Sequence, residues 1–371
     1  GFSVSVKQLN MGIIGTGSSG VQAIPVIAKQ AEHLYVFQRT PNYTVPARHG
    51  TVTQESLAEV KRNYEAIMEK AKWSSGGAHY DPSTTLAMSV SDHEREAIYE
   101  RAWQEGGFKF LIDTFADIAI DVEANKTASD FIRKKIREIV KNPAVADKLA
   151  PTDHPFASKR PLIDTDYFDT YNRPNVTLVD IRNAPIQEIT ETGIRTADGQ
   201  YDFDILVFAT GFDAMTGTYN KIDIQGRDGR KLKDDWVAGP MTYLGVATSG
   251  FPNMFMITGP GSPSVLSNMP VSIEQHVEWI GNVIEHMRSN GIATFEADSQ
   301  AQADWVAHVN ELASQTLYMQ ANSWYLGANI PGKPRVFMPY VGGVGTYRQK
   351  CDEVAAAGYE GFVLGREPAH A

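Results

Sequence analysis

Six residues near the start of the chain have the types and spacing of a loop that binds the pyrophosphate of a dinucleotide. They read Gly15-Thr16-Gly17-Ser18-Ser19-Gly20, after the apolar run Met11–Ile14 and before a segment with helical spacing. In this fingerprint the first glycine makes the turn, the second lets the backbone approach the phosphates, and the third lets helix and strand pack. The helix N-terminus offers free N–H groups and a positive dipole end to the anion. Because strand and helix flank the loop, a nucleotide site is favoured over a plain glycine turn.

The residue after the next apolar strand discriminates between the two nicotinamide dinucleotides. Leu34–Phe37 reads as that strand, and Gln38-Arg39-Thr40 follows it. An NAD site places Asp or Glu near this position for the ribose 2′-hydroxyl. Arg39 instead suits the 2′-phosphate of NADP, since a guanidinium pairs with phosphate through two parallel hydrogen bonds. The sequence therefore predicts NADP(H), against the alternative of a solvated surface arginine.

Other patterns that carry chemistry are weak in this sequence. His276 lies between Glu274 and Glu278 on a predicted helix, but no His-Glu-x-x-His pattern or His/Cys cluster supports a metal site. No Gly-x-Ser-x-Gly elbow indicates a hydrolase. The single cysteine, Cys351, excludes an internal disulfide and is consistent with a reducing compartment. We therefore expect a cytoplasmic protein without a bound metal, in which Cys351 is an unreactive buried residue.

Composition and charge limit the partners. The 371 residues are 42% hydrophobic and 21% charged, as in an ordinary soluble protein of two or three domains. The formal net charge of −10 argues against sequence-independent binding to nucleic acid or to an anionic membrane surface. No apolar run is long enough to span a bilayer. We expect a small-molecule substrate as the partner, with no nucleic acid and no membrane, and the oligomeric state is left open.

The elements around the glycine loop predict an α/β fold with a doubly wound, Rossmann-like sheet. A strand at 11–14, a helix at 21–31 and a strand at 34–37 form half of such a unit. Ile205–Phe208 reads as a further parallel strand, buried on both faces because all four residues are apolar. The residues that follow it, Ala209-Thr210-Gly211, stand at the carboxyl end of a strand, where such sheets bind nucleotides.

Elsewhere the patterns predict helices, one hairpin and an ordered loop. Asp198-Gly199 marks a hairpin turn, and residues 254–257 resemble a short strand. Apolar residues recur at helical spacing in the segment 51–150 and again in a helix expected at 272–287. We predict capping boxes at two helix starts, and residues 321–347 read as an ordered loop. The hairpin strands are expected at Gly193–Thr196 and Tyr201–Phe203. The residues at helical spacing in 51–150 are Leu57, Val60, Tyr64, Ile67, Met68, Phe131, Ile132, Ile136, Ile139 and Val140. The two capping boxes are Thr127 with Asp130 and Ser272 with Gln275.

Five longer segments resemble the Baeyer–Villiger monooxygenases, which are FAD- and NADPH-dependent enzymes that insert one oxygen atom next to a ketone carbonyl. The resemblance, closest to the phenylacetone and cyclohexanone type, covers nearly the whole chain in family order. The segments are GTGSSGVQAIPVIAKQAEHLYVFQRTPNYTVPAR (15–48), HPFASKRPLIDTDYFDTYNRPNV (154–176), VFATGFDAMTG (207–217), ITGPGSPSVLSNMPVSIEQHVEWI (257–280) and SWYLGANIPGKPRVFMPYVGG (323–343).

The resemblance implies roles for two adjacent cations. Lys159 would bind the NADP 2′-phosphate beside Arg39 and Thr40, and Gln22 joins the glycine loop among the NADP-binding residues. Arg160 would face the flavin and stabilise a negatively charged C4a-peroxyflavin, as a preorganised positive charge does for a developing anion. Spacing alone would make Lys159 and Arg160 solvated surface residues.

The resemblance also implies roles for three later segments. Ala209-Thr210-Gly211 would link the two nucleotide domains. Gly259–Met269 would run beside the flavin ring and the substrate pocket, with Met269 nearest the isoalloxazine. Trp324 would belong to a mobile lid that closes over NADP and excludes water, although a core tryptophan is an equally good interpretation of the residue alone.

The resemblance predicts three parts: an NADPH-binding Rossmann-like domain (1–40 and 153–212), a helical insertion (41–152) and the C-terminal half of an FAD-binding domain (213–371). Two family features are missing from the sequence, namely an earlier glycine fingerprint for FAD and a Phe-x-Gly-x-x-x-His-x-x-x-Trp signature ahead of the NADPH loop. We therefore expect an N-terminally truncated form, which would purify colourless and without monooxygenase activity.

The predicted function of the whole enzyme is the oxidation of a ketone by NADPH and O₂ to an ester or lactone. One alternative is a flavin monooxygenase that acts on amines or sulfides. Another is a non-catalytic NADP(H)-binding fragment. The sequence does not name the ketone, because the pocket residues come from several loops.

Overall fold

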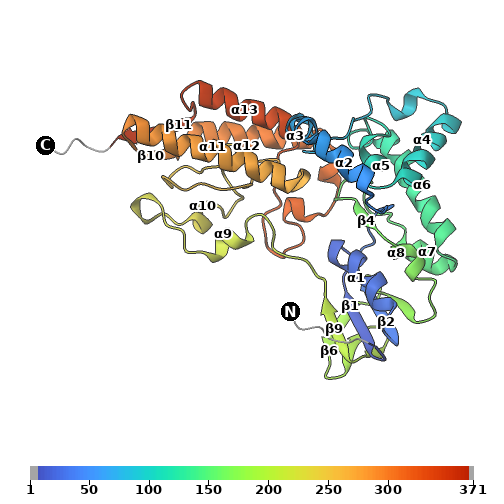
Figure 1. Ribbon diagram of the computed structural model, residues 1–371. Coiled ribbons are helices and arrows are strands. Elements are labelled where there is room, and N and C mark those ends of the chain that lie inside the picture. The colour runs from blue at the N-terminus through green and yellow to red at the C-terminus, as the bar shows by residue number, and fades with distance from the viewer. Residues whose placement is uncertain (1–6, 367–371) are drawn as a thin grey trace. The chain divides into compact units, whose positions relative to one another are not determined.

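The structure, a computed structural model, describes residues 7–366, and the chain forms two compact units (Figure 1). The first unit comprises the residues up to Gly50 together with Pro82–Phe212, and the second comprises Thr51–Asp81 together with the residues from Asp213 onward. The predicted helical insertion is divided between them, because residues 51–81 cluster with the second unit and residues 82–152 with the first.

A parallel sheet with the strand order β5-β2-β1-β9 lies in the first unit. Its strands are β1 (Asn10–Ile14), β2 (His33–Gln38), β5 (Val176–Asp180) and β9 (Ile205–Phe208), and helix α1 (Ser18–Ala28) follows β1. Helix α1 buries Val21, Ile24 and Ala28 in the same core as the strand residues Met11 and Leu34. The predicted α/β, doubly wound arrangement is confirmed.

Strand β9 differs from its prediction as a strand buried on both faces. Within the described residues it pairs with β1 alone, so it forms an edge of the sheet. Ile205, Leu206 and Val207 are half-buried, and Phe208 is 61% exposed. An apolar run therefore did not distinguish an edge strand from a central one.

The hairpin prediction is confirmed by a small antiparallel sheet, β6 (Ile186–Ile189), β7 (Gly193–Thr196) and β8 (Gln200–Asp202). A further pair of short parallel strands, β3 (Thr44–Pro46) and β4 (Leu162–Asp164), lies in the same unit. The remaining helices of the first unit are η1 (Ala87–Ser89), α4 (Asp92–Glu105), α5 (Lys109–Ile112), α6 (Val122–Ile139), α7 (Pro143–Leu149) and α8 (Tyr167–Thr170).

Helix α6 shows the expected buried face but not the expected start. Phe131, Ile132 and Ile136 are buried. Asp121 caps the helix by accepting the Ala124 N–H at 2.8 Å. Thr127 lies inside the helix, where its hydroxyl donates to the carbonyl of Ala124. The predicted capping box at Thr127 and Asp130 is wrong, since an aspartate one and a half turns earlier serves as the cap.

The second unit is built from long helices and one short antiparallel pair of strands. Its core contains Trp279, Phe295, Trp305 and Tyr347, and Cys351 is buried among them. The elements are α2 (Gln54–Arg62), α3 (Tyr64–Trp73), α9 (Gly217–Lys221), η2 (Arg227–Gly229), α10 (Leu232–Asp235), η3 (Ser264–Leu266), α11 (Met269–Asn290), β10 (Ile292–Ala297), α12 (Ser299–Ser314), η4 (Leu317–Gln320), η5 (Trp324–Leu326), α13 (Val344–Ala356) and β11 (Phe362–Arg366).

Two predictions for the second unit need correction, namely the capped start of α11 and the strand at 254–257. Helix α11 starts at Met269, after Asn268 and with Pro270 in its first turn, so Ser272 and Gln275 are buried residues inside the helix and form no capping box. Residues 254–257, inside the described range, form no strand. Asn253 and Thr258 at either end of that stretch have positive φ, which extended strands do not tolerate.

The apolar spacing in α2 and α3 predicts helices correctly, but their apolar face is not buried in the structure. Leu57, Val60 and Tyr64 are 37%, 48% and 58% exposed. Periodicity identifies a helix without showing which face packs.

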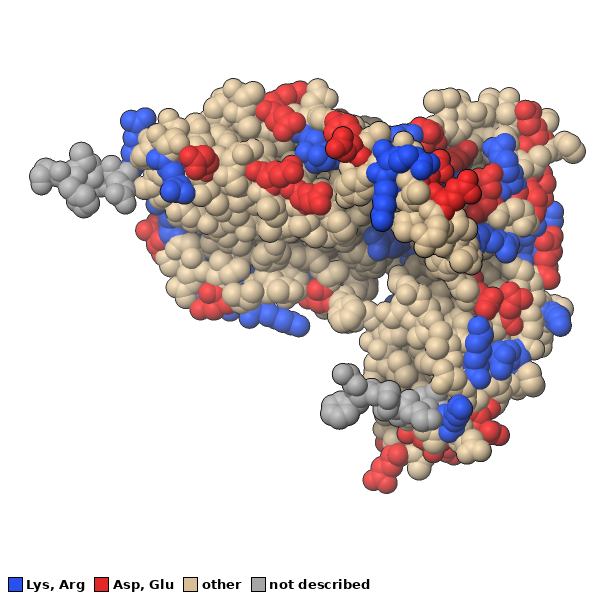
Figure 2. All heavy atoms as spheres, in the orientation of Figure 1, with Lys and Arg blue, Asp and Glu red and all other residues tan. Residues whose placement is uncertain are grey.

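On the face shown in Figure 2, acidic and basic side chains are interspersed. This mixture shows no extended basic surface of the kind that binds nucleic acid. None of the helices within 7–366 combines the length and the apolar character that a bilayer crossing needs.

Candidate functional site: a nucleotide-binding loop and its cations

The three glycines of the loop 15–20 have the three local environments that the fingerprint requires. Gly15 has φ +106°, and a Cβ there would lie 2.3 Å from the carbonyl oxygen of Ala209. A Cβ on Gly20 would lie 2.2 Å from the carbonyl oxygen of Gly15. Around Gly17, no described atom lies within 4 Å of an added Cβ. Gly15 and Gly20 are thus required by packing, whereas Gly17 leaves open space where a phosphate would approach.

The N-terminus of α1 is open toward that space. Its N-cap is Gly17, no side chain of the described residues caps it, and its first turn contains no acidic residue. Two hydrogen bonds fix the loop at Thr16. The Thr16 hydroxyl donates to the Thr40 carbonyl at 3.1 Å, and the Asn42 amide donates to the Thr16 carbonyl at 2.8 Å. Ser18, Ser19 and Gln22 all lie in α1. The uncapped N–H groups and the helix dipole suit an anion.

We expect Gly15→Ala to lower the stability of the protein and Gly17→Ala to lower its affinity for NADPH. Gly15→Ala should lower the free energy of unfolding by about 2–4 kcal/mol, because the Cβ meets Ala209 at a positive φ. Gly17→Ala, with an ordinary φ of −80°, should keep the urea midpoint and weaken NADPH binding. Urea denaturation and a fluorescence titration measure the two effects. Equal stability losses would show that the loop has been placed wrongly.

Three cationic side chains gather beside the loop in the first unit. Arg39, directly after β2, is exposed, and Lys159 is half-buried. Arg182 donates from Nε to the Arg39 carbonyl at 3.0 Å and from Nη2 to Asp153 at 2.8 Å. Burial lowers the pKa of Lys159; Asp153 opposes this shift, and Arg39 and Arg182 add to it. Lys159 is thus a cation that an incoming anion would stabilise.

Asp153 keeps this group of cations together. Its carboxylate is bound by the Nδ1–H of His154 at 2.6 Å and by Arg182 at 2.8 Å. Burial acts to raise the pKa of Asp153, but His154, Lys159 and Arg182 outweigh it and lower the pKa. Burial and Lys159 lower the pKa of His154, which favours the neutral ring. An ionised Asp153 therefore offsets part of the positive charge and fixes Arg182 behind Arg39.

Sequence reasoning missed Arg182 and Asp153. A usable signal exists for Arg182, because it is the second residue after β5, and Arg39 is the first residue after β2. The two strands are parallel neighbours with Gln38 opposite Asp180, and parallel strands bring their carboxyl ends to one edge of the sheet. Asp153 has no comparable signal, since it lies in an irregular segment before Lys159.

The chain was compared with proteins of known sequence and structure. It is 46% identical over 367 residues to the phenazine N-monooxygenase PhzNO1 of Lysobacter antibioticus, covering 98% of this chain and 67% of that protein. It is 44% identical over 365 residues to a Baeyer–Villiger monooxygenase of Pseudooceanicola batsensis, covering 98% and 66%. A crystal structure of OTEMO in complex with FAD and NADP matches with a TM-score of 0.94 at 41% identity, over 98% of this chain and 67% of that one.

The chain belongs to the Baeyer–Villiger monooxygenase family. The resemblance drawn from the five segments is confirmed, as is the α/β fold class. No family model matches the chain. The chain spans about two thirds of the length of the curated relatives it matches, at 67% and 66%.

In this Baeyer–Villiger family member, the structure places the other predicted residues in one unit or the other. Arg160 is exposed next to Lys159 in the first unit. Ala209-Thr210-Gly211 follows β9; Ala209 contacts the glycine loop, and Gly211 has φ +89°. Met269 is the first residue of α11, and Trp324 opens η5, both half-buried in the second unit. Trp324 packs on Tyr325, with ring centroids 4.5 Å apart. The role of each residue stays a prediction.

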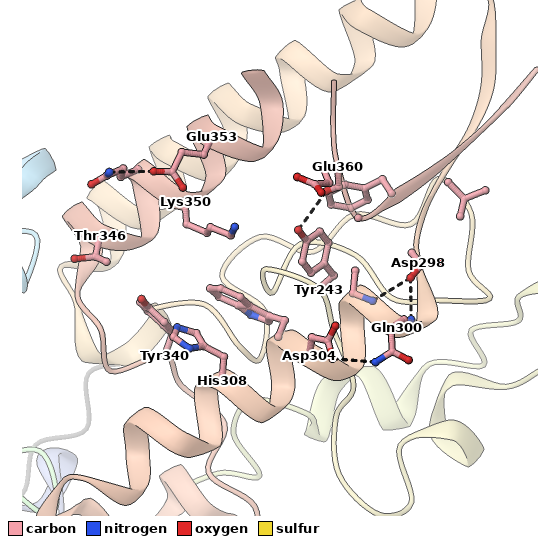
Figure 3. Close-up of a pocket in the computed structure, with 16 residues that line it drawn as sticks. Tyr243, Asp298, Gln300, Asp304, His308, Tyr340, Thr346, Lys350, Glu353 and Glu360 are labelled. Atoms are coloured by element: carbon pink, nitrogen blue, oxygen red, sulfur yellow. Dashed lines mark hydrogen bonds between the residues drawn. The ribbon is translucent and has the colours of Figure 1, made fainter. Parts of the chain in front are cut away.

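A cavity of about 880 Å³ lies beside α12 and α13 of the second unit (Figure 3). Its lining includes Tyr243, Tyr340, Asp304 and Lys350, so it combines aromatic walls with charges of both signs. None of the predicted site residues lines it. Groups of His, Cys, Asp or Glu able to hold a metal ion are not found in the part of the chain that the structure describes.

Proposed function

We propose that this chain provides the NADPH-binding part, and one side of the flavin site, of an enzyme that oxidises a ketone with NADPH and O₂ to an ester or lactone. The observation that carries the proposal is the glycine loop beside the cations Arg39, Lys159 and Arg182. A dinucleotide with a 2′-phosphate has two anionic groups: the pyrophosphate would bind at the glycine loop, and the 2′-phosphate would bind at the cations. The family to which the chain belongs supports the oxygenation chemistry.

The residues of the first unit fit NADP. The open space at Gly17 and the uncapped start of α1 would receive the pyrophosphate. Arg39, Thr40 and Lys159 would bind the 2′-phosphate, and Asp153 with Arg182 would hold Arg39 in place. These cations would favour NADPH over NADH, since NADH lacks the 2′-phosphate.

The residues of the second unit fit one end of a flavin. Helix α11 is 22 residues long, and within the described residues its N-cap Asn268 makes no side-chain capping bond. Pro270 has no N–H, so the first-turn donors that would face a carbonyl or anion are the N–H groups of Met269 and Val271. Gly259–Met269 would lie along the ring, with Met269 nearest to it. When bound, the flavin supplies the electron transfer and the activation of O₂, while the protein orients and shields the reactants.

The proposed role of Arg160 is electrostatic. An arginine guanidinium carries a planar, delocalised positive charge. A fixed positive charge aimed at developing negative charge stabilises the transition state without reorganisation. Trp324 would help to exclude water once NADP is bound.

A second candidate function, the N-oxygenation of an aromatic nitrogen heterocycle, is favoured by one specific finding. The relative at 46% identity is a phenazine N-monooxygenase. An assay that measures NADPH oxidation and product formation with a cyclic ketone, an alkyl sulfide and a phenazine distinguishes the candidate functions. We expect product from the ketone at the highest kcat/KM. Product from the phenazine alone would replace the proposed function with N-oxygenation.

A further inference from the structure

The start of the loop that precedes α11 has an unusual backbone. Thr258 has φ +53° and Ser264 has φ +43°, and neither is a glycine. A β-branched residue such as threonine rarely adopts this left-handed region, because its side chain crowds the backbone. Such conformations persist only where the surroundings determine them, and they are frequent at ligand-binding sites.

A second irregular segment, at residues 243–247, packs directly on this loop. Leu244 has φ +54° and Gly245 has φ +70°. A Cβ on Gly245 would lie 2.6 Å from the backbone nitrogen of Ser262, and a Cβ on Gly259 would lie 2.5 Å from the carbonyl oxygen of Gly245. The two backbones touch with no side chain between them, so the shape of one fixes the shape of the other.

His276 of α11 and Tyr347 of α13 bridge these two segments. The Thr258 N–H donates to His276 Nδ1 at 2.8 Å, and His276 Nε2 lies 2.8 Å from the Tyr347 hydroxyl. That hydroxyl donates to the Leu244 carbonyl at 2.5 Å. Because Nδ1 accepts a hydrogen bond, the ring proton of neutral His276 must be on Nε2, from where it donates to Tyr347. Both side chains are buried, at 0% and 1% exposure.

Other buried groups hold the next residues of the same loop. The Thr242 hydroxyl donates to the Pro260 carbonyl at 2.5 Å, and Trp305 Nε1 donates to the Gly261 carbonyl at 3.0 Å. The backbone N–H of Tyr340, which lines the cavity in Figure 3, donates to the Ser262 carbonyl at 2.8 Å. The loop is therefore fixed at successive residues, and His276 holds Thr258, the residue of positive φ directly before it.

We propose that His276, in its neutral Nε2–H form, and Tyr347 are a pair of positioning residues that hold the loop Gly259–Met269 in the shape that receives the flavin. The contact of this loop with flavin rests on the proposed function. The hydrogen-bond relay itself does not depend on that function. Burial lowers the pKa of His276 to about 4, so the ring is uncharged near neutral pH and can accept at Nδ1.

Two variants test the hydrogen bonds at Nδ1 and at Nε2 of His276 one at a time. In His276→Asn, Oδ1 takes the place of Nδ1 and can still accept from Thr258. In His276→Gln, the terminal amide reaches the Nε2 position and retains only the contact with Tyr347. Amide exchange at Thr258 should be about tenfold faster in the glutamine variant than in the asparagine variant, since one hydrogen bond is lost. Tyr347→Phe serves as a second variant that removes the link to Leu244.

Nitrogen-15 NMR of the histidine ring reads the tautomer directly in the unmodified chain. We expect the proton on Nε2. A proton on Nδ1, or equal exchange rates for the two variants, would overturn the proposal.

A second readout uses an FAD-loaded enzyme of the full length of its relatives with a ketone. The glutamine variant should oxidise more NADPH without forming product, with an unchanged KM for NADPH, and the asparagine variant should behave like the wild type. An identical ratio of product formed to NADPH oxidised in both variants would overturn the positioning role. A wild type that forms no product would instead refute the proposed function and leave the exchange comparison valid.

Discussion

In an FAD-loaded enzyme of the full length of its relatives, replacing Arg160 with alanine is expected to abolish ester formation while NADPH still reduces the flavin. Arg160 is exposed and adjacent to Lys159, so its removal should not disturb the buried core. Loss of a preorganised charge at a reacting anion lowers kcat by about 10²–10³-fold. Stopped-flow absorbance follows flavin reduction, and gas chromatography follows the ester.

Arg160→Lys is the matched control for this prediction. It keeps a positive charge but not the planar guanidinium, so we expect partial activity. Normal ester formation by Arg160→Ala would rule out the proposed role.

The second large effect concerns cofactor choice. Arg39→Ala should weaken NADPH binding by about 1.5–3 kcal/mol, because it removes a charge-assisted contact to the 2′-phosphate. NADH has no such phosphate, so its affinity should change little. Titration calorimetry with both cofactors gives the comparison. Arg137→Ala, which removes an exposed arginine of the same unit that pairs with Asp147, is the control for a general loss of positive charge. An equal loss for both cofactors would refute the assignment of Arg39.

The features that local sequence determines could be predicted. The glycine loop, β1, β2 and the hairpin at Asp198-Gly199 follow from turn chemistry and apolar spacing, which act over a few residues. The cation at Arg39 was predictable for the same reason, since its position relative to β2 is local. Lys159 and Arg160 became candidates only through the resemblance to the family.

Features that depend on packing between distant segments could not be predicted. The edge position of β9, the partner role of Asp153 and the bridge from His276 to Tyr347 arise from contacts between residues far apart in the chain. The start of α11 was misplaced because Ser272 has the type of a capping residue, whereas Asn268 and Pro270 begin the helix. The buried hydrogen-bond relay through His276 has no sequence signature.

The most direct test of the central claim is to follow ¹⁸O from ¹⁸O₂ during NADPH-dependent turnover of a cyclic ketone by an FAD-loaded enzyme of the full length of its relatives. We predict one labelled oxygen atom in each lactone molecule, the other in water, and one NADPH consumed per lactone. Reduction of the ketone to an unlabelled alcohol, or consumption of NADPH with no labelled product from any ketone, would contradict the account.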